Sequence, residues 1–225
     1  LMTEDAQGYS TAIGASALKM QNSGGTSYNV AVGSEAGVAV STGVQNTLIG
    51  SKAGLALAGG DGVVAVGFEA LMTEDGNGNS VAVGRQALRT QNAGAEAYNV
   101  AVGNGAGYNV STGVQNTLIG GVAGDALQTG EANVVIGYNA GGVGDNWSRC
   151  VAIGRAALGN HNPSGTSSTV TANVAVGYDA LTTCNTGTNN TAIGYQAGQD
   201  LQGGNNNVFI GLQSGDNVVA GENNV

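Results

Sequence analysis

The amino-acid sequence predicts an all-β fold: a parallel β-roll or β-solenoid of about 12 coils with a 17-residue period. Three observations predict it. A pentad of the form Asn/Ser-Val/Thr-Ala-Ile/Val-Gly recurs along the chain, β-branched residues alternate with a small residue inside it, and glycine supplies 41 of 225 residues. A collagen-like or Pro-rich disordered chain is excluded because the sequence holds a single proline, Pro163.

The pentad ends in a glycine that recurs at a nearly constant spacing. The spacing is longer after Gly14 and Gly84, and it is longest between Gly154 and Gly177. The pentad glycines are Gly14, Gly33, Gly50, Gly67, Gly84, Gly103, Gly120, Gly137, Gly154, Gly177, Gly194 and Gly211. Such a regular period is typical of repeat proteins, in which each repeat is one coil stacked on its neighbours.

A second, longer period groups the coils into blocks of four. The segment from Ser41 to Gly50 returns unchanged from Ser111 to Gly120, which indicates a recent duplication. We interpret residues 1–225 as a single repeat domain with blocks 1–70, 71–140 and 141–215. Residues 216–225 begin a further coil, and the sequence stops within a repeat, so we expect a fragment of a longer fibre.

Within each pentad, the residues one and three before the glycine are β-branched and fall on one face of a strand, while the residue between them falls on the other. A strand with two apolar faces needs cover on both. A coil this short encloses a core only a few side chains wide, which covers one face. The sequence therefore favours self-association, in which sister chains cover the second face; a single-chain solenoid is the alternative.

The residues after the pentad predict how the coils stack. Three residues after the glycine stands Ala in eleven of twelve coils, and a small residue there allows close approach of successive coils. The two positions directly after the glycine vary, which places them on the outside of a turn. The longer coils are expected to bulge on one side, the longest around Asn160 to Thr171.

Asparagine occupies the first position of the pentad in eight of twelve coils. These residues are Asn29, Asn46, Asn99, Asn116, Asn133, Asn173, Asn190 and Asn207. Stacked amides can bond to one another or to backbone groups of the turns, so we interpret this column as structural.

Three segments carry a resemblance to a known family: SVAVGRQAL at Ser80 to Leu88, NVAVGYDAL at Asn173 to Leu181, and NTAIGYQAG at Asn190 to Gly198. They resemble the S-V-A-I-G-x-x-A head repeats of trimeric autotransporter adhesins and related repeats of phage tail fibres. The resemblance implies a trimeric parallel β-roll, so we expect an intertwined or side-by-side homotrimer. It also implies an extracellular, structural and host-attachment role in a virion tail fibre, or alternatively in an adhesin head on the bacterial outer surface. The period of this chain is longer than the one common in adhesin heads, so its coil must carry a longer return turn.

No catalytic site, cofactor or metal is expected. The only histidine, His161, lies in the longest loop beside Pro163, where solvent exposure is the ordinary outcome. Polysaccharide cleavage would need paired carboxylates along a groove, and the acidic residues are sparse and scattered. Tandem calcium-binding motifs are absent. An ice-binding face would need rows of Thr-x-Thr motifs, and Thr169 to Thr171 is nearly the only such motif in the sequence. Cys150 and Cys184 are expected to be free thiols, with Cys150 at least partly buried.

The net charge and the hydropathy pattern limit the classes of partner that the chain can bind. A net charge of −9 disfavours nucleic acid and anionic membranes, and no apolar run is long enough for membrane insertion. A host cell-surface receptor or polysaccharide remains as a partner class.

Four aromatic residues directly follow a pentad glycine: Phe68, Tyr138, Tyr178 and Tyr195. Exposed aromatic rings can stack on sugars, which makes these residues candidate receptor or glycan contacts. The alternative is that they shield neighbouring turns.

Overall fold

The computed structural model describes residues 8–76, 78–163 and 169–225. It divides into two compact units, the first reaching Val114 and the second spanning Gln115–Val225. The described residues form β-strands and turns without any helix.

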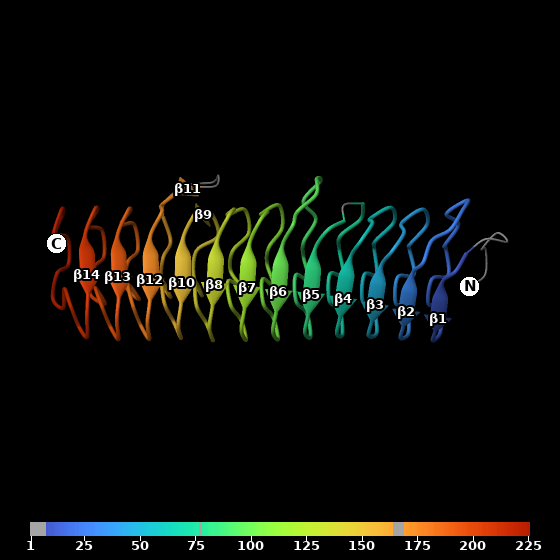
Figure 1. Ribbon diagram of the computed structural model, residues 1–225, viewed down its shortest axis with the longest axis horizontal. Helices are drawn as coiled ribbons and strands as arrows, with labels where there is room; N and C mark the ends of the chain where they lie inside the picture. Colours follow the sequence, from blue (N-terminus) through green and yellow to red (C-terminus); the bar gives the residue numbers. More distant parts are fainter. Residues whose placement is uncertain (1–7, 77, 164–168) are drawn as a thin grey trace. The chain divides into compact units, whose positions relative to one another are not determined.

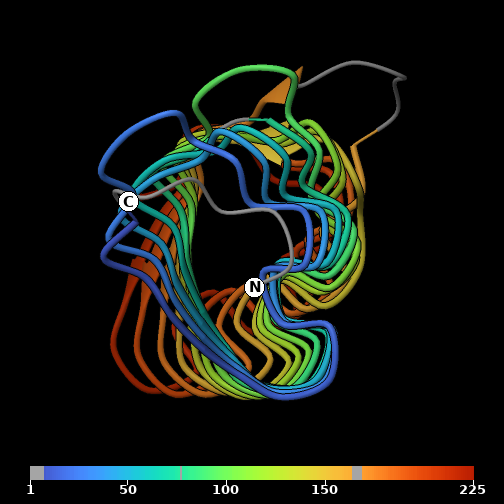
Figure 2. The ribbon, with the colours of Figure 1, turned by 90° about the vertical axis from the view of Figure 1, so that its right-hand side faces the viewer.

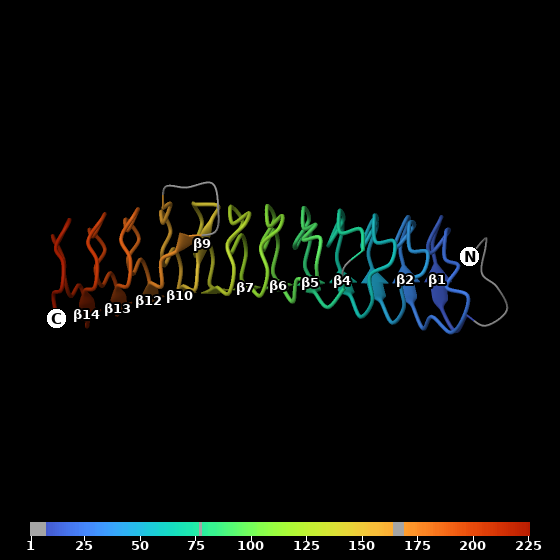
Figure 3. The same cartoon turned by 90° about the horizontal axis from the view of Figure 1, so that it is seen from above.

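The first unit is a parallel stack of three-residue strands, one at each pentad. Its strands are β1 (Thr11–Ile13), β2 (Val30–Val32), β3 (Thr47–Ile49), β4 (Val64–Val66), β5 (Val81–Val83) and β6 (Val100–Val102). Each strand pairs with the next in sequence and in pentad register, as Thr11 does with Val30 and Ile49 with Val66. Figures 1 and 3 show these strands side by side in two views.

The second unit repeats the arrangement. Its strands at the pentads are β7 (Thr117–Ile119), β8 (Val134–Ile136), β10 (Val151–Ile153), β12 (Val174–Val176), β13 (Thr191–Ile193) and β14 (Val208–Ile210). Two shorter strands, β9 (Trp147–Ser148) and β11 (Thr169–Val170), form a separate parallel pair. A strand therefore lies at every pentad of both units, which confirms the parallel β-solenoid and its predicted period.

The core of each unit is narrow and built mainly from alanines and leucines. The middle residue of the pentad strand points inward and is buried, as Ala31 and Leu48 are, and so is the Ala three residues after the glycine, as at Ala36 and Ala53. Leucines such as Leu57 fill the remaining space. Within each unit successive coils follow nearly the same path around this core (Figure 2). The β-branched residues of each strand consequently point out of the coil.

The coil turns through residues with left-handed backbone conformation. In a typical coil they lie at the pentad glycine, two and four residues after it, and five residues before it, with φ of 59° at Glu35 and 61° at Gln45. Many of these residues are not glycine, although a left-handed L-residue costs about 1 kcal/mol or more. Coil stacking must therefore impose this conformation against the local preference.

The pentad glycine is required by close approach of the backbones. At Gly120, φ is +132°, and a Cβ atom would lie 2.6 Å from the carbonyl oxygen of Gly137 in the next coil. Gly33 is in the same situation, with 2.6 Å to the carbonyl oxygen of Gly50. Any side chain at this position would push the coils apart.

The column of pentad asparagines ties each coil to the next. All eight are buried, and each donates from Nδ2 to a backbone carbonyl 14 residues further on, as Asn46 does to Gly60 at 2.7 Å. In most of them the side-chain oxygen Oδ1 accepts from the backbone N–H of the equivalent residue in the next coil. Asn190 Oδ1, for example, accepts from the N–H of Asn207 at 3.0 Å. Direct amide-to-amide bonds also occur, for example from Asn133 Nδ2 to Asn116 Oδ1 at 3.0 Å. The column thus satisfies buried backbone groups that the short strands leave unpaired.

The longer coils carry their extra residues between the turn that follows the pentad glycine and the next pentad strand. In the first unit, the connections from β1 to β2 and from β5 to β6 extend beyond those of the shorter coils (Figure 2). The expected bulge of the longest coil, around Asn160 to Thr171, includes residues 164–168, which lie outside the described residues.

We expect Gly120→Ala to lower the free energy of unfolding by more than about 3 kcal/mol, since the new Cβ collides with the backbone of the next coil. The matched control is Gly211→Ala. Gly211 has a similar φ of +123°, but no atom lies within 4 Å of the place that a Cβ would take, so its cost should be the conformational one, about 1 to 3 kcal/mol. Urea unfolding of both variants, followed by circular dichroism, measures the difference. Equal losses would show that close approach of the coils is unimportant.

Val122 offers the opposite test. Its φ of 49° is unfavourable for a β-branched residue, whereas the same coil position holds Asn139 and Gly105 elsewhere. Val122→Asn should raise the free energy of unfolding by about 0.5 to 1 kcal/mol. Val122→Thr keeps the β-branch and should bring no gain. A decrease with Asn in the same unfolding measurement would contradict a strained Val122.

Candidate attachment surface

The outward face of the pentad sheet is an exposed apolar surface in each unit. We call it the outer face and define it by the residues one and three before each pentad glycine. Its most exposed large members are Ile13, Val30, Ile49 and Val102 in the first unit and Ile119, Ile193 and Ile210 in the second. These side chains are between 36% and 65% exposed, although isoleucine and valine are ordinarily buried. A regular row of such residues is typical of a surface that another molecule covers.

The four predicted aromatic contacts are all exposed, and they are divided between the two units. Phe68 belongs to the first unit, and Tyr138, Tyr178 and Tyr195 to the second. With Arg155, the three tyrosines take the position after the glycine in four successive coils of the second unit, and we call these four residues the aromatic column.

Within the aromatic column, Tyr178 and Tyr195 stack with ring centroids 5.3 Å apart and an interplanar angle of 11°. From the preceding coil, the Arg155 guanidinium lies 5.0 Å from the Tyr178 ring centroid, and its Nη1 donates to the Tyr178 hydroxyl at 2.8 Å. Both faces of the Tyr178 ring are thus engaged by neighbouring coils. A ligand of this column would meet ring edges and hydroxyl groups rather than an open face.

A second aromatic position was not recognised in the sequence. Tyr9, Tyr28 and Tyr98 lie five residues before a pentad glycine and are exposed, and Tyr9 stacks on Tyr28 with centroids 5.6 Å apart. The Tyr98 hydroxyl donates to the Glu96 carboxylate, and this bond raises the pKa of Tyr98. The shared offset from the glycine is the signal that would have found these residues.

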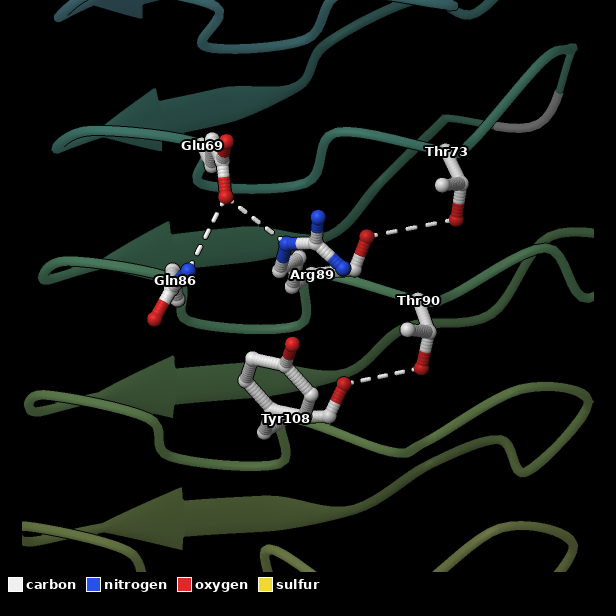
Figure 4. A network of polar contacts seen from close by, with 6 residues as sticks. All are labelled: Glu69, Thr73, Gln86, Arg89, Thr90 and Tyr108. Carbon is white, nitrogen blue, oxygen red and sulfur yellow. Dashed lines mark hydrogen bonds and ion pairs between the residues drawn. The ribbon is translucent and has the colours of Figure 1, made fainter.

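A polar ladder occupies one wall of the first unit (Figure 4). The Glu69 carboxylate accepts from Gln86 Nε2 at 2.9 Å and from Arg89 Nε at 2.8 Å, and Arg89 lies 5.5 Å from the Tyr108 ring centroid. The bonds from Gln86 and then Arg89 lower the pKa of Glu69. Because these side chains satisfy one another across three coils, we interpret the ladder as a brace between coils.

The prediction that His161 is exposed is wrong. The side chain is fully buried, with Nδ1 2.9 Å from the carbonyl oxygen of Cys184 and Nε2 2.9 Å from Thr171 Oγ1. Burial lowers the pKa of His161, so the ring is neutral near pH 7. A carbonyl only accepts, so Nδ1 carries the hydrogen and Nε2 accepts from Thr171.

The period of the blocks explains this burial. His161 stands where the first coils of the other two blocks have Gln21 and Gln91, which are buried as well. Gln91 Nε2 donates to Ser80 Oγ at 3.1 Å, and Gln21 Nε2 donates to Ser10 Oγ at 3.0 Å. Each block thus begins with a buried polar side chain facing its own hydrogen-bond partners, which we call the block polar cluster. Comparing equivalent positions of the three blocks would have revealed it.

The two cysteines are free and buried, as expected for Cys150. Burial raises the pKa of the Cys184 thiol to about 12 and also raises that of Cys150. Both therefore stay protonated and poorly reactive at neutral pH.

Among the residues that the structure describes, no group of three or more His, Cys, Asp or Glu side chains could hold a metal ion. No helix in the same residues is long and apolar enough to cross a bilayer. Comparison of the chain with protein-family models, curated proteins and solved structures finds no match.

The buried His161 predicts a pH dependence. Its pKa is about 6.5 in the unfolded chain and lower in the folded one, so the unfolded state binds the proton first as the pH falls. The free energy of unfolding should be highest above pH 7. As the pH falls below about 6.5, it should decrease by up to about 1.4 kcal/mol per pH unit until the pKa of the folded state is reached. Urea unfolding between pH 7.5 and 5.5 measures this slope.

His161→Gln is the control, because glutamine occupies the equivalent position in the other two blocks. We expect the variant to fold and to lose this part of the slope. If the wild type and His161→Gln decline in parallel over this range, the titration of His161 is not the cause.

Proposed function

We propose that this chain is a structural and host-attachment segment of an extracellular fibre, of the kind found in phage tails, and that it works as a homotrimer. The observation that carries the proposal is the outer face. Each unit has a row of exposed Ile and Val side chains, and a sister chain with the same coil pitch can cover that row along its length.

The energetics favour self-association over isolation. Burying the exposed part of one isoleucine contributes about 1 kcal/mol, so a row of such residues offsets the cost of ordering sister chains side by side. The residue pattern matches this role, because β-branched residues (Val, Ile and Thr) recur on this face at a fixed pitch. A repeated strip binds its own copy in register more readily than it binds an unrelated globular surface.

The chemistry of the titratable groups supports a role without catalysis. His161 is neutral and enclosed, and Cys150 and Cys184 are protonated and enclosed, so none of them is placed to meet a substrate. The best-formed ion pair, between Glu69 and Arg89, joins neighbouring coils. A net charge of −9 on every copy opposes binding to nucleic acid and to anionic membranes.

The proposal predicts the mass of the particle in solution. Sedimentation or light scattering of the 225-residue chain should give about three times 21.9 kDa. Ile49→Lys together with Ile193→Lys should shift the population to single chains, because a cation would have to be buried in the contact. The fold itself should persist, since both side chains point away from the core.

The control pair is Asn92→Lys with Gln202→Lys, two exposed polar positions away from the outer face, and it should leave the trimer unchanged. A wild-type particle of about 21.9 kDa would contradict the trimer and leave a single-chain solenoid.

A further inference from the structure

A groove of about 580 Å³ lies on one wall of the second unit. Every residue that lines it is uncharged. Its polar side chains come mainly from the positions six and eight residues after the pentad glycine of three successive coils: Asn160, Asn162, Thr183, Asn185 and Gln202. Val143 and Val219 add apolar surface from the coils on either side.

The amides in this groove are free to bind a ligand. Asn160, Asn162, Asn185 and Gln202 are exposed, and their side-chain amides have no hydrogen-bond partner within residues 8–76, 78–163 and 169–225. The pentad asparagines of the same coils differ in both respects, since they are buried and bonded. The groove amides are therefore not needed for stacking the coils.

The backbone beneath these amides is held in register. Asn162 N–H donates to the carbonyl of Asn185 at 2.9 Å, Asn185 to that of Gln202 at 2.8 Å, and Gln202 to that of Val219 at 2.8 Å. Parallel coils repeat at about 4.8 Å, so the groove presents a row of amide donors and acceptors at that interval. Because the coils fix the backbone of the row before any ligand arrives, only the side-chain rotamers remain to be ordered on binding.

The chemistry of the row selects its ligand. An amide both donates and accepts, which matches the hydroxyl groups of a sugar, and the repeat is close to the length of one residue in an extended glycan. The C–H surfaces of sugar rings can rest on Val143 and Val219. Anionic ligands lack a cation to pair with, and Asp145 in an adjoining hollow of about 260 Å³, which Asn162 also lines, repels them. Small cofactors fit poorly, because their sites are predominantly apolar and enclosed.

We propose that this groove binds a neutral oligosaccharide chain, whose hydroxyl groups exchange hydrogen bonds with Asn160, Asn162, Asn185 and Gln202. The proposal names the ligand class for the attachment role and rests on that role. The groove lies at coil positions other than those of the outer face, so self-association and glycan binding can be measured separately.

The test applies the 225-residue chain to immobilised hexasaccharides of glucose, mannose and N-acetylglucosamine, with sialylated and sulfated glycans of equal length beside them. We expect binding to a neutral glycan, which calorimetry then quantifies. Asn162→Ala with Asn185→Ala should weaken it about tenfold, because two hydrogen-bonding amides are removed. The thermal unfolding midpoint should stay unchanged, since neither side chain has a hydrogen-bond partner among the described residues.

The matched control is Asn22→Ala with Asn92→Ala. These residues hold the same coil position in the first unit and make the same backbone bond, at 2.9 Å to Ser41 and to Ser111. Their loss should leave the affinity unchanged. Tyr178→Ala with Tyr195→Ala tests the aromatic column as the competing glycan site.

The proposal is overturned by binding to acidic glycans only, by no binding to the neutral panel, by an equal loss in the control pair, or by a loss confined to the tyrosine pair. If the chain is a trimer that binds no glycan, the glycan-binding proposal fails and the proposed fibre role stands. If single chains bind the glycan, the proposed trimer is contradicted and the glycan-binding proposal stands.

Discussion

The close approach of successive coils at the pentad glycine is the constraint on which both units depend. There the carbonyl of one glycine occupies the space that a Cβ of the preceding one would need, as between Gly33 and Gly50. Backbones at this distance hold three-residue strands in register, although such strands are short for a β-sheet. The same stacking keeps residues such as Glu35 and Gln45 in a left-handed conformation that they would not adopt alone. Contacts between neighbouring coils thus outweigh local preference, as is usual in solenoid proteins.

Stacking also divides the polar side chains into two kinds. The pentad asparagines are buried and complete the backbone bonding of the next coil. Asn162 and Asn185, eight residues after the glycine, are exposed, and their side chains have no hydrogen-bond partner in the part of the chain that the structure describes. One residue type therefore serves cohesion at one coil position and is available for recognition at another.

Much of this fold could be predicted because the repeat carries it. The spacing of the glycines indicated the coils, and the alternation of Val, Ala and Ile placed a strand at each pentad. Which face points inward came from the structure, where Ala31 is buried and Val30 is exposed. The aromatic positions could be recognised as outward-facing, but the stacking of Tyr178 between Tyr195 and Arg155 depends on side-chain conformations that a period does not specify. His161 was misjudged because its loop was read alone: its burial follows from the position it shares with Gln21 and Gln91. The groove could not be predicted, because its residues are ordinary turn residues in the sequence. They differ from other turn residues only in that their exposed amides line one hollow, which the structure alone shows.

The block polar cluster has a consequence for how such a chain avoids pairing errors while it folds. Coils within a block look alike, so a coil could dock one place out of step with little loss of apolar contact. A slip by one coil, however, would set Gln91 against a leucine or valine position and leave its buried amide unsatisfied, which costs about 1 to 3 kcal/mol. A slip by one block between the first two blocks keeps the serine partner, because Ser10 and Ser80 are equivalent. Mistakes in threading should therefore come in steps of four coils, which is also the unit by which the sequence itself has been duplicated.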